Sequence, residues 1–175
     1  MRSRDKMKNS KIKRLTELAL LTAAALIIFV IELQIPYPFP IPGIKPGFAN
    51  IITVYAVYHY KAHEVAAVCA VRILLGAVFT GNVTALIYSA AGTLLCLLGM
   101  LPLKRILDEK HIWMTSIIGA VLHNTGQMAA ALIVMQTPQL MLYYPFLLVS
   151  GCIAGAFTGL CAQFVTMRLR KEKKP

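Results

Sequence analysis

The chain has 175 residues, of which 58% are hydrophobic and 14% are charged, and its mean hydropathy is +0.67. Soluble domains carry about 25% charged residues, so this composition excludes a disordered chain, a coiled coil and an ordinary soluble enzyme. The 18 Lys and Arg outnumber the 7 Asp and Glu, but they cluster beside long apolar runs, as the topology determinants of membrane helices do. We therefore expect a protein whose partner is the lipid bilayer and not a nucleic acid.

In chain order, six apolar segments predict an all-α membrane protein, a bundle of six transmembrane helices. Four are long enough to cross a hydrocarbon layer of about 30 Å, whereas the second and third, with 14 and 15 residues, predict short tilted spans or a hairpin that enters from one side. A backbone inside a bilayer must satisfy its own hydrogen bonds, and continuous apolar runs exclude a barrel. The segments are Leu15–Ile35, Gly47–Tyr60, Val65–Phe79, Val83–Leu103, Ile112–Met135 and Tyr143–Met167.

The basic residues predict the orientation of this bundle. An even number of crossings places both termini on one side, and that side collects 16 of the 18 Lys and Arg, against only Lys45 on the other. Because Lys and Arg favour cytoplasmic loops, we expect both termini on the cytoplasmic side of the cell membrane. The expected parts are a basic tail at 1–14, an integral membrane domain at 15–167 and a second basic tail at 168–175.

The connection after the first segment, residues 36–47, holds five prolines. Proline fixes φ and removes hydrogen-bond donors, so this outer loop should be stiff and non-helical. It is either a lid over a cavity or a rigid connector between two helices.

Polar side chains inside a membrane are energetically unfavourable, so we expect each of them to have a hydrogen-bonding partner or a functional role. Glu32, near the outer end of the first segment, could face an outer cavity. Arg72 in the third segment could bind an anionic ligand, bind helix carbonyls or snorkel. His123 and Gln127 are four residues apart on one helix face, with Asn124 adjacent. For this cluster, ligand contact and hydrogen bonding between helices both stay open.

Small residues form two stripes, Ala19-x-x-x-Ala23 and Gly151-x-x-x-Gly155-x-x-x-Gly159. Such stripes let another helix approach closely, either a helix of this chain or one of a partner. The four cysteines lie in apolar runs without metal-ligand spacing, so we expect free thiols packed as small hydrophobic groups.

Sequence motifs of catalysis are missing from the chain. It has no Gly-x-x-x-x-Gly-Lys-Ser/Thr run, no aspartate-rich cluster to hold magnesium on a diphosphate and no order of residues typical of acyl transfer. We therefore expect neither an enzyme nor a cofactor or metal ion.

Two stretches carry a family resemblance. The run Arg14-Leu15-Thr16-x-x-Ala19-Leu20-Leu21-x-Ala23 follows a basic start, and Gly43-Ile44-Lys45-Pro46-Gly47-Phe48-Ala49-Asn50-Ile51 follows the proline-rich loop. These stretches resemble a membrane family described as heptaprenyl diphosphate synthase component I, or Gx transporter. More widely, the whole chain is similar in size and segment count to the substrate-binding S components of energy-coupling factor (ECF) transporters.

The resemblance to S components implies six helices around an outward-facing pocket capped by the 36–47 loop. It also implies that the chain binds a small solute and that Ala19 and Ala23 contact a membrane T component, which couples to two ATPase subunits. The family description implies a different function, a non-catalytic accessory subunit of a prenyl diphosphate synthase, and a membrane scaffold is a third possibility. The pocket candidates are Asn50, Arg72, Asn82, Tyr88, His123, Asn124 and Gln127.

Overall fold

The computed structural model describes residues 2–34 and 47–172, and these residues form helices joined by short turns. The proline-rich loop lies outside the described residues, except for Gly47. The helices are α1 (Arg2–Gln34), α2 (Asn50–His59), α3 (Ala62–Thr80), α4 (Val83–Ile106), η1 (Glu109–His111), α5 (Ile112–Met135), η2 (Pro138–Tyr143) and α6 (Tyr144–Glu172).

Five of these helical stretches are long and apolar enough to cross a membrane. The expected helical bundle is therefore present, but the third segment is a longer helix than its apolar run suggested, with 19 residues, and α2 is shorter, with 10. At 1.5 Å per residue, α2 measures about 15 Å, half of a hydrocarbon layer of about 30 Å. The described residues thus form a bundle of five helices of membrane-spanning length around one half-length helix, α2, and the six crossings that the sequence predicts stay a prediction.

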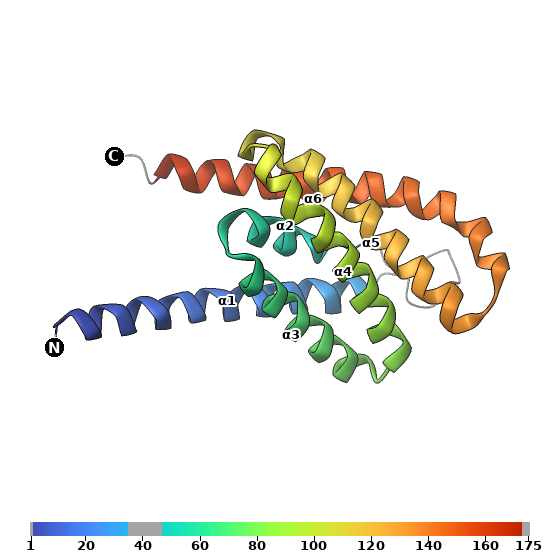
Figure 1. The fold of residues 1–175 in the computed structure, drawn as a ribbon, viewed down its shortest axis with the longest axis horizontal. Helices are drawn as coiled ribbons and strands as arrows, with labels where there is room; N and C mark the ends of the chain where they lie inside the picture. Colours follow the sequence, from blue (N-terminus) through green and yellow to red (C-terminus); the bar gives the residue numbers. More distant parts are fainter. Residues whose placement is uncertain (1, 35–46, 173–175) are drawn as a thin grey trace.

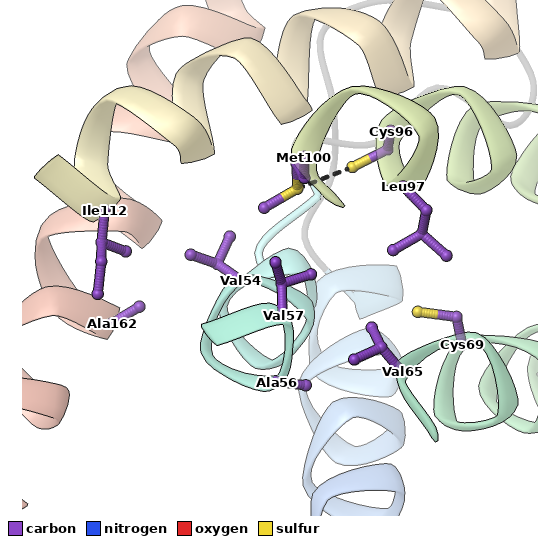
Figure 2. Close-up of a cluster of buried hydrophobic side chains, with 10 residues drawn as sticks. All are labelled: Val54, Ala56, Val57, Val65, Cys69, Cys96, Leu97, Met100, Ile112 and Ala162. Atoms are coloured by element: carbon purple, nitrogen blue, oxygen red, sulfur yellow. Dashed lines mark hydrogen bonds between the residues drawn. The ribbon is translucent and has the colours of Figure 1, made fainter. Parts of the chain in front are cut away.

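The half-length α2 is the centre of the bundle. It contacts each of the five other α-helices, and Figure 1 shows it between the α1–α3 pair and the α4–α5–α6 layer. Residues on more than one side of α2 contribute to an apolar core toward the end of the bundle where α1 begins and α6 ends, and Figure 2 shows the side chains that meet there. These side chains belong to Val54, Ala56, Val57, Val65, Cys69, Cys96, Leu97, Met100, Ile112 and Ala162.

The glycine stripe of α6 packs against α5 of the same chain. A Cβ at Gly155 would lie 2.8 Å from the Cα of Ile117, and one at Gly159 would lie 2.6 Å from the Cα of Trp113. Only a residue without a side chain allows two backbones to come this close. From the sequence, this stripe could pack against a helix of this chain or of a partner. In the structure it packs against α5 of the same chain.

Basic residues from distant parts of the sequence gather at one end of the bundle. Arg14 forms an ion pair with Glu64 at the start of α3, and Lys104 donates hydrogen bonds to the carbonyls of Val57 and Tyr60. The beginning of α1 and the end of α6 lie at that same end in Figure 1. The structure thus groups the basic segments as the sequence predicted, while their cytoplasmic location stays a prediction.

The four cysteines are free thiols, as the sequence predicted. Cys69 and Cys96 are buried in the apolar core, and the Cys96 thiol contacts the Met100 sulfur at 3.3 Å. Both therefore pack as small hydrophobic side chains.

Candidate functional site

A hollow lies at the N-terminal end of α2, where this short helix leaves part of the bundle unfilled. Helices α1, α3, α4 and α5 form its walls, and the residues around the start of α2 contribute to its lining. The hollow has a volume of about 50 Å³, enough for a few water molecules. Its polar lining consists of Glu32, Asn50, Arg72, Thr80, Ser89, His123 and Gln127.

Arg72 reaches the hollow from the buried face of α3. It shares that face with Val68, Cys69 and Gly76, and 8% of the residue is exposed. The opposite side of α3 carries exposed apolar side chains such as Leu74 and Val78. Arg72 therefore points into the protein and does not lie along the lipid-facing surface, as a snorkelling arginine would.

Glu32 lines the hollow from the end of α1 and is 3% exposed. Its carboxylate accepts a hydrogen bond from the backbone N–H of Gly47 at 2.5 Å. Gly47 adopts a left-handed φ of +77°, which suits glycine, and its carbonyl accepts from the Asn50 N–H at 2.9 Å. Glu32 thus ties the end of α1 to the turn that opens α2, and the expectation that it faces a cavity agrees with this geometry.

His123 and Gln127 approach the hollow from α5, one helical turn apart. They are 7% and 5% exposed, and His123 Nδ1 and Gln127 Oε1 have no hydrogen-bond partner among the described residues. Both pack against Gly92 of α4, where a Cβ would lie 2.7 Å from the Gln127 Cγ. Buried polar atoms are nearly always hydrogen-bonded, so these two atoms have spare capacity for a ligand or water.

The structure brings Asn50, Arg72, His123 and Gln127 together and gives the other three candidates different surroundings. Asn82 caps the start of α4, where its side chain accepts the Ala85 N–H at 3.0 Å. Tyr88 is buried in an apolar cluster with residues that include Met128 and Leu147. Asn124 donates to the Leu147 carbonyl of α6 at 2.8 Å. None of these three lines the hollow, and their assignment to ligand binding stays a prediction.

Sequence reasoning missed two polar residues of the hollow, Thr80 and Ser89. Ser89 directly follows Tyr88, and it shares a helix face with Ala85 and Leu86, which also line the hollow. Helical periodicity separates neighbours in sequence by about 100°, so Ser89 lines the hollow while Tyr88 lies in the apolar cluster.

Ala19 and Ala23 lie at a second surface feature, an apolar groove of about 440 Å³ between α1 and α3. Both alanines are exposed, and the walls include Leu26, Val71 and Leu75. The small-residue stripe of α1 is therefore open to the outside of the bundle within the described residues, unlike the glycine stripe of α6.

Comparison with known proteins gives one match. The family model of heptaprenyl diphosphate synthase component I covers residues 21–165, which include every residue named as lining the hollow. No curated protein and no solved structure matches the chain. The family description agrees better with the accessory-subunit alternative than with the expectation of an ECF S component. The chain belongs to the heptaprenyl diphosphate synthase component I family.

Proposed function

We propose that this chain is a non-catalytic membrane subunit that binds a small solute in the hollow above α2 and passes it inward with partner proteins, as an S component of an ECF-type importer does. The observation that carries this proposal is the meeting of Arg72, His123 and Gln127 from α3 and α5 in one buried hollow. Polar groups are energetically unfavourable inside a membrane bundle. Buried polar atoms without a hydrogen-bond partner are therefore typical of a binding site.

The positions of the basic residues support transport from the outside toward the cytoplasm. The hollow adjoins the N-terminal end of α2, and the basic residues gather near the opposite end of that helix, where Lys104 binds the carbonyl of Tyr60. If the basic end is cytoplasmic, as the positive-inside rule favours, the hollow lies toward the outer side of the membrane. A solute would then enter from outside and leave toward the cytoplasm.

The groove between α1 and α3 is the surface at which we propose that the partner protein binds. Ala19 and Ala23 form its small-residue stripe, so a helix could lie close to the α1 backbone there. In this function the occupant is the membrane T component, and its two ATPase subunits supply the energy.

A second function is favoured by the family description. In that function the chain is the membrane-embedded accessory subunit of a heptaprenyl diphosphate synthase, and another component carries the catalysis. Among the described residues, no group of three or more His, Cys, Asp or Glu could hold a metal ion. The catalytic magnesium ions that a prenyl synthase uses would accordingly belong to the partner.

Co-purification from native membranes separates the two functions. The intact chain, carrying an affinity tag, should recover a T component and two ATPases if it is an S component. Recovery of a soluble prenyl synthase alone, with synthase activity that depends on this chain, would replace the first function by the second.

Substitution at the groove tests the same proposal in the chain itself. Ala19→Leu or Ala23→Leu should reduce recovery of the T component, because the added atoms keep the partner helix away from α1. Ala70→Leu, on an exposed position of α3 outside the groove, is the matched control and should leave recovery unchanged. Equal recovery from all three variants would exclude the groove as the coupling surface.

A further inference from the structure

Arg72 brings a positive charge into the interior of the bundle, and none of the described residues is a counter-ion in contact with it. It lies near the middle of α3 and is 8% exposed, and no described residue forms an ion pair or hydrogen bond with its guanidinium. A charge that is buried without a partner is strongly unfavourable, whereas a bound anion would neutralise it. The guanidinium also offers two parallel N–H groups, which match a carboxylate or a phosphate.

The polar groups around Arg72 indicate which second chemical group the ligand contains. Glu32, which lines the same hollow, is already hydrogen-bonded to the Gly47 N–H. His123 Nδ1 and Gln127 Oε1 are buried without described partners, and both residues line the hollow. A ligand group that both donates and accepts hydrogen bonds, such as a hydroxyl, would satisfy them.

The size of the hollow favours a small anionic group over a diphosphate. A buried water needs about 10–15 Å³, so about 50 Å³ holds the equivalent of roughly three to five water molecules. A carboxylate with a neighbouring hydroxyl has fewer atoms than a diphosphate and needs less of this space. The space therefore favours the carboxylate.

We propose that the hollow recognises a small solute by its carboxylate group, which Arg72 binds through both guanidinium N–H groups, while His123 and Gln127 bind a hydroxyl beside it. This proposal rests on the proposed function, because it names the class of solute that the same hollow takes. It differs from the alternative function in excluding a diphosphate as the preferred group.

Thermal unfolding of the full chain in nanodiscs of zwitterionic lipid tests this proposal. The probes are glycolate, its neutral analogue glycolamide, inorganic phosphate and diphosphate, with ionic strength held constant by chloride. Zwitterionic lipid removes anionic headgroups as a competing source of the same charge. Glycolate should raise Tm in a saturable way, and glycolamide should not.

Variants of Arg72 test whether the rise in Tm with glycolate depends on its guanidinium group. Arg72→Gln should weaken glycolate binding by about ten-fold to a hundred-fold, the range expected for a charge-assisted hydrogen bond. Arg72→Lys keeps the charge but not the paired N–H groups, and should give an intermediate loss even if Arg72→Gln fails to fold. Arg14→Gln removes an equal charge from the Arg14–Glu64 ion pair at the basic end, and should leave the response intact.

Three results would overturn the proposal: no response to glycolate in the parent chain, an equal response in Arg72→Lys, or a stronger response to inorganic phosphate or diphosphate than to glycolate. The last result would also favour the synthase subunit. Co-purification with a T component does not depend on these probes. The carboxylate proposal can therefore be refuted while the proposed function stands, and the proposed function can be refuted while the carboxylate proposal stands.

Discussion

Gly126 is a residue at which the backbone of α4 comes close to α5. A Cβ at this position would lie 2.7 Å from the carbonyl oxygen of Ala91 and 2.9 Å from the Cα of Gly92. Ordinary contacts of this kind begin near 3.4 Å, so Gly126→Ala would force the two helix backbones apart by roughly 0.7 Å. Neither neighbouring atom can rotate away, because both belong to the backbone.

The expected cost follows from two opposing effects. Overpacking of a tight contact costs about 1–3 kcal/mol. The exchange of glycine for alanine in a helix returns up to about 1 kcal/mol. We therefore expect Gly126→Ala to lower the free energy of unfolding by about 1–2 kcal/mol, or Tm by roughly 2–8 °C for a chain of this size.

Gly99→Ala is the matched control on the same pair of helices. Its Cβ would contact the Leu122 Cδ1, the far end of a flexible side chain that can change rotamer. This variant should be as stable as the parent chain or slightly more stable. Thermal unfolding of both variants in the same nanodiscs measures the difference, and a Gly126→Ala variant that is as stable as Gly99→Ala would refute the reasoning from backbone contact.

Three further substitutions test single hydrogen bonds and ion pairs by the same unfolding measurement. Asn82→Ala removes the N-cap of α4 and should cost about 0.5–2 kcal/mol, without changing the response to glycolate. Asn124→Ala removes the bond to the Leu147 carbonyl and should cost about 0.6–2 kcal/mol; a lost glycolate response with unchanged stability would place Asn124 in the site instead. Glu64→Gln breaks the pair with Arg14, whose side chain is 45% exposed, and should lower Tm only slightly, with a smaller effect at high salt.

The class of the fold could be predicted from the sequence because continuous apolar runs in a lipid environment leave helix as the only state. The ends of the helices were harder to predict. The third segment was expected to begin at Val65, but α3 begins at Ala62, because the Glu64 carboxylate accepts the Lys61 N–H and starts the helix within a polar stretch. Hydropathy alone does not detect such a cap.

The candidate site was predictable in part. His123 and Gln127 share a helix face, so their meeting in the hollow follows from the helical period, and Asn124 points toward α6 for the same reason. That Arg72 reaches the same hollow could not be read from spacing, because it depends on how α3 packs against the rest of the bundle. The separation of the lining residues from Asn82 and Tyr88 has the same origin.

The short α2 explains why the hollow exists at all. A full-length helix in its place would continue past Asn50 and occupy the space between Glu32, Arg72 and His123. Instead the chain enters the bundle through the turn at Gly47, and a non-helical backbone at this depth is tolerated where protein surrounds it or where it borders a polar cavity. The bond from the Gly47 N–H to Glu32 satisfies that turn, and the space it leaves is where buried polar groups of α3 and α5 meet. Glu32→Ala removes the acceptor of the Gly47 N–H and should therefore reduce the rise in Tm that glycolate produces. The Tm without glycolate should fall little, because the turn bounds the hollow while the apolar core beneath α2 stays intact.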